Sequence, residues 1–267
     1  MLLLVDAGNS RVKWALMERA VLGAAALGQW EASGSVEHEH VGQLTDAWRG
    51  RKIARAILTI VAGPSMRDRR EQILLRAIGV KPMPMEWLAA SPALAGVRNC
   101  YREPQQLGSD RFASAIGGHA LFPDRPLIIV TCGTATTIDA VAVDGVFTGG
   151  MILPGLQLMA SSLAKKTAQL PAVLQQNEPL PPFADNTDGA IASGCMAAQA
   201  GAIERAFAGY ARLNPGLSVQ CIMSGGAAAL VERHLEIPCT HVDNLVLIGL
   251  QTVALHQQSA GSVPGIR

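Results

Sequence analysis

Two stretches of the chain share one pattern of hydrophobic and polar positions, a short apolar run that enters a turn of small polar residues. The first stretch is residues 2–10, LLLVDAGNS, and the second is residues 127–134, LIIVTCGT. A second run with strand character follows each turn, so each stretch predicts a strand, a glycine turn and another strand. Glycine lets the backbone approach a ligand closely, and the neighbouring polar groups supply hydrogen-bond donors. Both turns are therefore candidate anion-binding hairpins.

The two hairpins align with each other, with Gly8 opposite Gly133 and Asn9 opposite Thr134. An internal repeat of this kind predicts two related halves, although two glycine hairpins can also match by chance. Residues 123–126, which begin and end with proline, are predicted to join the halves. This gives two predicted domains, residues 1–122 and 123–267.

Hydrophobic spacing predicts further elements between and after the hairpins. In the first half these are a strand over 53–61, a helix over 65–78, a strand near 80–85 and a helix over 112–121. Asp110 lies where the N-cap of that last helix would lie. In the second half we predict helices over 156–166 and 187–213, a strand over 219–223 and a final helix from 243 or 244. Thr187 or Asp188 is the predicted cap of the long helix, whose stripe of small residues suits packing within the chain or across a dimer.

Composition narrows the class of protein. Hydrophobic residues make up 49% of the 267 residues and charged residues 16%, which excludes a disordered chain. The formal net charge of +1 gives no electrostatic case for binding nucleic acid or an anionic membrane. No apolar stretch approaches the roughly 20 residues of a membrane span, and the first five residues are too short for a signal-peptide core. The five cysteines form no C-x-x-C pair, so we expect reduced thiols in a cytoplasmic protein.

Several candidate sites are weak or missing. His38 and His40 alternate with glutamates in a predicted loop, and a solvated surface is favoured over a metal site because no third ligand has suitable spacing. The sequences G-x-x-x-x-G-K-[ST], G-x-G-x-x-G and G-x-S-x-G are absent. Ser224-Gly225-Gly226 connects a predicted strand to a helix, a turn that either admits a nucleotide or is only a tight corner.

Five segments in order resemble one family. They are Asp6-x-Gly8-Asn9-Ser10, Gly108-x-Asp110-Arg111, Gly133-Thr134-Ala135-Thr136-Thr137-x-Asp139, Gly149-Gly150-x-Ile152-x-Pro154-Gly155 and Ser224-Gly225-Gly226. Together they resemble the type III pantothenate kinases, which belong to the acetate kinase, sugar kinase, Hsp70 and actin superfamily. The resemblance spans nearly the whole chain. It implies an α/β fold of two ribonuclease-H-like (actin-like ATPase) domains, each a mixed five-stranded sheet flanked by helices.

The resemblance also implies a reaction, the transfer of the γ-phosphoryl group of ATP to the primary hydroxyl of pantothenate, which opens coenzyme A synthesis. It implies Mg²⁺ held by Asp6 and Asp110 as the general base. It further implies pantothenate as substrate and a homodimer with the active site at the interface. The residues implied to bind ATP or its phosphates are Asp6, Gly8, Asn9, Ser10, Lys13, Gly133, Thr134, Gly225 and Gly226. The residues implied to bind pantothenate are Tyr101, Gly108, Ser109, Asp110, Arg111 and Thr187.

One position departs from the family. Thr131 stands where family members usually carry an aspartate tied to a monovalent cation, K⁺ or NH₄⁺, and threonine offers a hydroxyl without a charge. This departure supports an alternative, a catalytically idle relative that binds nucleotide or pantothenate as a regulatory or accessory protein. A third interpretation keeps the fold but changes the substrate to a sugar or acetate. The pantothenate-type segment 101–111 argues against it.

Overall fold

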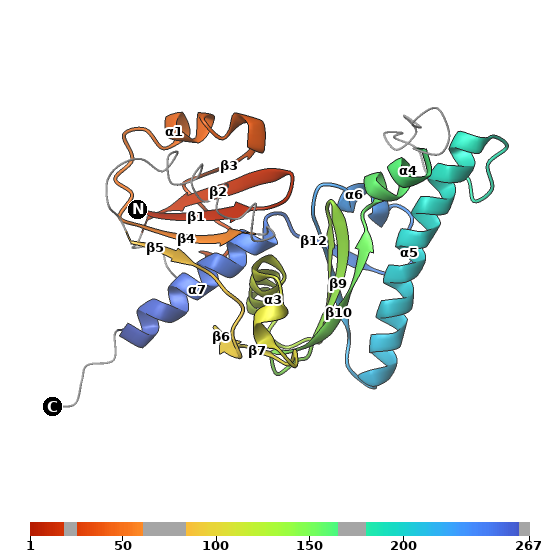
Figure 1. The fold of residues 1–267 in the computed structure, drawn as a ribbon. Coiled ribbons are helices and arrows are strands. Elements are labelled where there is room, and N and C mark those ends of the chain that lie inside the picture. Colours follow the sequence, from red (N-terminus) through yellow and green to blue (C-terminus); the bar gives the residue numbers. More distant parts are fainter. Residues whose placement is uncertain (19–25, 61–83, 165–179, 262–267) are drawn as a thin grey trace. The chain divides into compact units, whose positions relative to one another are not determined.

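The structure, a computed structural model, describes residues 1–18, 26–60, 84–164 and 180–261 (Figure 1). Two compact units are formed, one by Met1–Leu121 with Asn244–Arg267 and the other by Phe122–Asp243. The predicted helix over residues 65–78 lies outside the described residues, as does all but the end of the strand predicted near 80–85. Among the described helices, none combines the length and apolar character needed to cross a membrane.

The first unit contains a five-stranded sheet with the order β3-β2-β1-β4-β5. Strand β1 is antiparallel to β2, which is antiparallel to β3, whereas β1 is parallel to β4 and β4 is parallel to β5. The continuous apolar run at the N-terminus forms the central strand, because a strand covered on both faces needs apolar residues at every position. The strand bounds are β1 Leu2–Ala7, β2 Arg11–Met17, β3 Ala32–Glu37, β4 Arg55–Ile60 and β5 Met85–Trp87.

The second unit repeats this arrangement strand for strand. Its strands have the order β12-β11-β8-β9-β10, with β8 antiparallel to β9, β9 antiparallel to β10, and β8, β11 and β12 parallel to one another. The predicted pair of mixed sheets is confirmed. Over the described residues, the first sheet has the predicted five strands, whereas the second has seven, two more than predicted. The bounds are β8 Leu127–Cys132, β9 Ala135–Val141, β10 Val146–Pro154, β11 Gln220–Ser224 and β12 Cys239–His241.

The last helix belongs to the first unit, so the compact units differ from the predicted domains at the C-terminus. Helix α7, Leu245–Gly261, packs on helix α3, Ser109–Leu121, so closely that a Cβ atom at Gly249 would lie 1.9 Å from the Ala113 carbonyl oxygen. Apolar residues of α7 share a buried cluster with β1. This tight packing, which the order of residues along the chain does not reveal, is why residues 244–267 group with residues 1–121 and not with 123–243.

Short elements complete the first unit. A 3₁₀ turn η2 (His38–His40) and helix α1 (Gln43–Ala47) follow β3, and a hairpin of β6 (Ala93–Leu94) and β7 (Val97–Asn99) precedes the 3₁₀ turn η3 (Pro104–Gln106). Helix α3 begins at Ser109, so Asp110 lies in its first turn and is not the N-cap residue.

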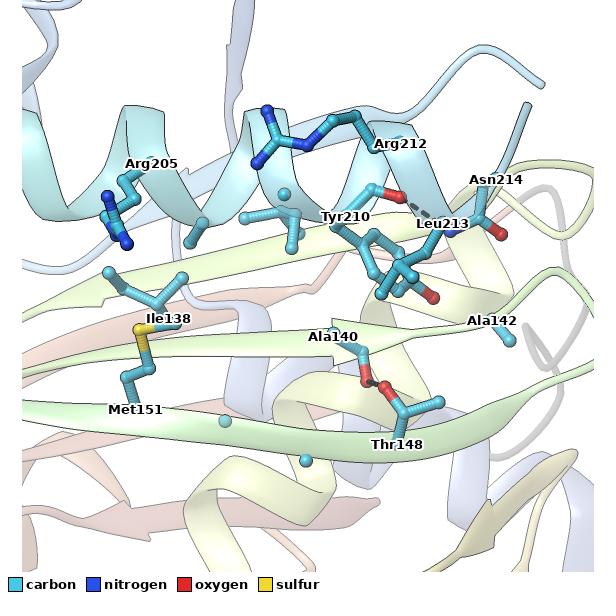
Figure 2. Close-up of a pocket in the computed structure, with 15 residues that line it drawn as sticks. Ile138, Ala140, Ala142, Thr148, Met151, Arg205, Tyr210, Arg212, Leu213 and Asn214 are labelled. Atoms are coloured by element: carbon cyan, nitrogen blue, oxygen red, sulfur yellow. Dashed lines mark hydrogen bonds between the residues drawn. The ribbon is translucent and has the colours of Figure 1, made fainter. Parts of the chain in front are cut away.

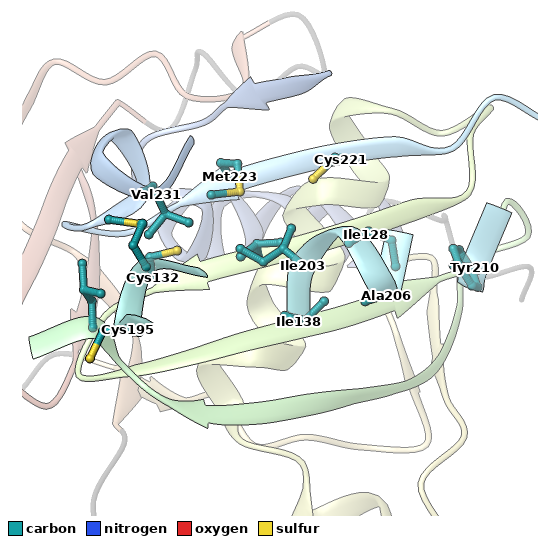
Figure 3. Close-up of a cluster of buried hydrophobic side chains, with 14 of the residues drawn as sticks. Ile128, Cys132, Ile138, Cys195, Ile203, Ala206, Tyr210, Cys221, Met223 and Val231 are labelled. Carbon is teal, nitrogen blue, oxygen red and sulfur yellow. The ribbon is translucent and has the colours of Figure 1, made fainter. Parts of the chain in front are cut away.

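Helices α4 (Leu156–Ala164), α5 (Thr187–Leu213) and α6 (Ala228–Glu232) belong to the second unit. Helix α5 lies along the sheet and buries Cys195, Ile203, Ala206 and Tyr210 against strand residues that include Ile128 and Ile138 (Figure 3). The predicted helix bounds, 187–213, are confirmed. The predicted cap is wrong, since the side chain of Asn186 accepts the hydrogen bond from the Gly189 amide at 2.8 Å.

Candidate active site

The first hairpin places Asp6 at the end of β1, where its carboxylate is partly buried. Lys13 on β2 and Thr59 on β4 are its neighbours in register on either side. The Thr59 hydroxyl, which is fully buried, donates a hydrogen bond of 2.9 Å to Asp6 Oδ1. Gly8, Asn9 and Ser10 form the turn that follows, and the last two are exposed. A carboxylate therefore lies beside a turn whose small polar residues Asn9 and Ser10 are exposed.

The pKa of Asp6 is raised from 3.8 to about 6. Burial is the largest cause, and the charge of Asp110 adds to it, while the hydrogen bond from Thr59 and the charge of Lys13 oppose it. Two carboxylates, Asp6 and Asp110, thus lie close enough within one unit to repel each other. A bound cation would relieve both the burial cost and this repulsion.

Asp110 lies in the first turn of α3 and remains partly exposed, so a substrate can reach it. Burial raises the pKa of its carboxyl group, against the opposing effects of the Arg111 amide and the Arg111 charge. A carboxylate that only stabilises a helix N-terminus has a lowered pKa. The raised pKa is typical of a functional carboxyl group and makes Asp110 a stronger base.

Arg111 lies next to Asp110 and is held by a small network. Its side chain is buried, donates a hydrogen bond of 3.0 Å to the Tyr101 hydroxyl, and stands 5.8 Å from the centre of that ring. Asn99 fixes the Tyr101 segment by accepting from the Tyr101 amide and donating to the Pro104 carbonyl, each at 3.0 Å. A guanidinium group fixed in this way is suited to binding a carboxylate or hydroxyl group of a substrate.

The position of the Asp110 carboxylate leaves no room for a side chain at residue 108, which is glycine. A Cβ atom at Gly108 would lie 2.6 Å from Asp110 Oδ1, so a larger residue would displace the carboxylate. Ser109 donates a weak hydrogen bond of 3.4 Å to the Ile60 carbonyl at the end of β4. The segment 108–111 is thus attached to the carboxyl end of β4, next to the strand that carries Asp6.

The second hairpin is closed by two glycines that lie in other segments. The Gly155 amide donates to the Thr134 carbonyl at 2.9 Å, and a Cβ atom at Gly155 would lie 2.2 Å from the Gly133 carbonyl oxygen. Gly225 has φ +97°, and a Cβ atom there would lie 2.4 Å from the Cys132 carbonyl oxygen. Gly226 faces open space. The turn at 224–226 therefore lies against the base of the hairpin, and the second unit brings Gly133, Thr134, Gly225 and Gly226 together.

Gly225→Ala is expected to lower the free energy of unfolding by about 1–3 kcal/mol, because alanine would be strained at this φ and would meet the Cys132 carbonyl. Gly226→Ala, one residue along, is the matched control and should change it by less than about 0.5 kcal/mol. Thermal unfolding of the ligand-free proteins measures both. Equal stability of the two variants would contradict this account of the turn.

In each sheet, three residues lie side by side in register on neighbouring strands at the hairpin, and these three residues differ between the two units. In the first unit the row is Lys13, Asp6 and Thr59, and in the second the register places Thr137, Thr131 and Ser224 in the equivalent order. The Thr137 hydroxyl is buried without a hydrogen-bond partner. The second row offers neutral hydroxyl oxygens where the first has a carboxylate and an ammonium group, so it does not fit the carboxylate-bound cation of the family.

Two residues that the sequence analysis did not assign to the site contact it. Thr59 bonds Asp6, and the Nε2 atom of His38, predicted to lie on a solvated surface, is 2.7 Å from the Gly8 carbonyl oxygen. The position of Thr59 at the end of a predicted strand could have indicated its role. Thr187, predicted to bind substrate, is the exposed first residue of α5.

A groove with a volume of about 800 Å³ lies in the second unit between the C-terminal half of α5 and strands β9 and β10. Its floor is apolar, and Arg205 and Arg212 project from the helix above it (Figure 2). Met151 and Leu213 line it with half or more of their surface exposed. Exposed apolar side chains gathered around a groove are typical of a protein contact surface.

Known proteins resemble the chain over nearly its whole length. The family model for type III pantothenate kinase matches residues 2–209. The type III pantothenate kinase of Janthinobacterium sp. (strain Marseille) is 58% identical, over 96% of this chain and 98% of its own. That of Herminiimonas arsenicoxydans is 56% identical, with the same coverage. Among solved structures, the ethanolamine utilization protein EutJ from Carboxydothermus hydrogenoformans has a TM-score of 0.54 at 12% identity, covering 95% of this chain and 89% of its own.

Proposed function

Since the chain belongs to the type III pantothenate kinase family, we propose that it transfers the γ-phosphoryl group of ATP to pantothenate with the residues of the two hairpins and of the segment 101–111. The observation that carries the proposal is the pair of partly buried carboxyl groups, Asp6 and Asp110, both with raised pKa, at the ends of neighbouring elements of one unit. Phosphoryl transfer depends mainly on positioning and on neutralising charge. We place the reaction in the cytoplasm, which suits the free thiols of all five cysteines.

Asp110 acts as the general base. Its raised pKa favours accepting the proton of the pantothenate hydroxyl. Arg111, held by Tyr101, binds the carboxylate or a hydroxyl group of pantothenate. The remaining residues assigned to pantothenate are Gly108, Ser109 and Thr187.

Asp6 is the residue that would hold Mg²⁺. A single carboxylate fits this ion, which keeps several waters and takes its other ligands from phosphate oxygens. The described residues contain no group of three or more metal-ligating side chains, so Asp6 would bind the ion together with ATP and not as part of a closed cage. When bound, Mg²⁺ neutralises the phosphate charge, and the backbone amides of Gly8, Asn9 and Ser10 and the ammonium group of Lys13 add to that effect. Gly133, Thr134, Gly225 and Gly226 are assigned to the nucleotide from the second unit.

A coupled assay of ADP formation tests the function, with mass spectrometry of the product to identify 4′-phosphopantothenate. Turnover with pantothenate and none with acetate or sugars is the expected result. Nucleotide binding without turnover would favour the alternative, an idle relative that acts as a regulatory or accessory protein. The intact pair of Asp6 and Asp110 argues against that alternative.

The activity is expected to be independent of K⁺ and NH₄⁺, because Thr131, Thr137 and Ser224 supply no carboxylate for such a cation. Replacing K⁺ by choline should change kcat/KM by less than about twofold, whereas Thr131→Asp should create a dependence on K⁺. Steady-state rates over a K⁺ titration measure both. A large activation of the wild-type protein by K⁺ would show that other groups bind the cation.

We assign the groove between α5 and strands β9 and β10 to the contact between two copies of the chain. Its apolar residues Met151 and Leu213 are 50% and 79% exposed. Burying them would stabilise a dimer through the hydrophobic effect. Light scattering should give twice the mass of one chain, and Leu213→Glu should lower it toward that of a monomer.

A further inference from the structure

His38 touches the phosphate-type turn of the first hairpin. Its Nε2 atom lies 2.7 Å from the carbonyl oxygen of Gly8, and the ring is half-buried. A carbonyl oxygen can only accept a hydrogen bond, so Nε2 carries the proton and donates. This contact comes from a residue 30 positions away in the chain and is independent of the assigned carboxyl groups.

The sheet brings His38 to this place. Arg11, the first residue of β2, pairs with Glu37, the last residue of β3, and their side chains form an ion pair of 3.1 Å. His38 follows Glu37 directly and therefore lies beside the turn that precedes Arg11. Its neighbour His40 lies in the same 3₁₀ turn and is exposed.

The contact determines how one peptide group is oriented. In a trans peptide the carbonyl of one residue and the amide of the next point in opposite directions. With the Gly8 carbonyl held by His38, the Asn9 amide is directed to the opposite side. If this peptide were reversed, a carbonyl oxygen would take the place of that amide and would repel a phosphate group instead of donating to it.

In the second unit, a residue at the position equivalent to His38 also forms a hydrogen bond with the hairpin turn. Ala135, the first residue of β9, pairs with Pro154, the last residue of β10, and Gly155 follows directly. The Gly155 amide donates to the Thr134 carbonyl at 2.9 Å. In each unit, therefore, the residue after the third strand donates a hydrogen bond to a carbonyl of the turn. The second unit uses a backbone amide for this, and the first uses a histidine side chain.

We propose that His38 is a positioning residue for the nucleotide, which holds the Gly8–Asn9 peptide with its amide toward the phosphates of ATP. The inference rests on the proposed function in so far as the first hairpin binds ATP. It assigns to His38 an effect on nucleotide affinity and none on pantothenate affinity.

Two substitutions of His38 by residues with side chains of similar length test this role. His38→Gln keeps an N–H donor, and His38→Met removes it. His40→Met is the matched control on the exposed neighbour. Calorimetry with Mg²⁺ and the analogue AMPPNP should show about tenfold weaker binding for His38→Met, the effect of losing one hydrogen bond. We expect the affinity for AMPPNP to fall by less than about threefold in His38→Gln and to stay unchanged in His40→Met. In turnover, KM for ATP should rise in His38→Met while KM for pantothenate stays within about twofold.

Unchanged AMPPNP affinity in His38→Met would overturn the inference, as would an equal rise in both KM values. His38→Ala repeats the comparison if the methionine variant does not fold, which its melting curve reports. Binding of AMPPNP requires no pantothenate, so the two proposals fail separately. A wild-type protein that binds AMPPNP but does not phosphorylate pantothenate would contradict the proposed function and leave the test of His38 intact.

Discussion

Asp110→Asn is expected to lower kcat by about 10²–10⁴-fold, the usual effect of removing a general base. The amide keeps the shape of the side chain but cannot accept the proton of the substrate hydroxyl. Because burial raises the pKa of Asp110, the ionised carboxylate is not a net stabilising group in the folded protein. The melting temperature of the variant should therefore equal or exceed that of the wild type. Steady-state kinetics and thermal unfolding measure the two effects.

The control for this substitution is Asp124→Asn, which makes the same chemical change at an exposed carboxylate shortly after helix α3. It should leave both kcat and the melting temperature unchanged. A different result at Asp110, in which the variant loses stability but keeps its rate, would show that Asp110 serves only the first turn of the helix.

Asp6→Asn is expected to abolish most of the turnover and to stabilise the ligand-free protein. The loss of turnover follows because an amide is a poor ligand for Mg²⁺. The gain in stability follows from the raised pKa. The difference between the ordinary value of 3.8 and about 6 corresponds to at most about 3 kcal/mol by which the ionised group destabilises the folded state. The asparagine Oδ1 can still accept the hydrogen bond from Thr59.

The sign of the pH dependence distinguishes this effect from ordinary packing. The pKa of Asp6 is higher in the folded state, so the wild-type protein loses stability as the pH rises from about 4 through about 6. Above that range the Asp6→Asn variant should melt a few degrees higher than the wild type in EDTA. Near pH 4 the two should melt together. A variant that is less stable at pH 8 without metal would contradict the assignment of Asp6 as a destabilising, functional carboxylate.

The duplication and most of the helices and strands could be predicted from local patterns in the amino-acid sequence. The apolar runs, the two glycine turns and the long helix over 187–213 were all predicted correctly, because periodicity and turn residues are local signals. The family was also evident, since five short segments in a fixed order constrain it far more than any one of them. Asp6 and Asp110 were identified as candidate site residues in the same way.

The distant residues that support the site could not be predicted before the folded arrangement of the strands was known. The hydrogen bonds from Thr59 to Asp6 and from His38 to Gly8 join segments that are far apart in the chain, and no local pattern reports strand order or register. The grouping of α7 with the first unit depends on the close contact of Gly249 with Ala113. The raised pKa values of Asp6 and Asp110 likewise arise from burial, and for Asp6 also from the charge of Asp110, and both effects exist only once the chain has folded.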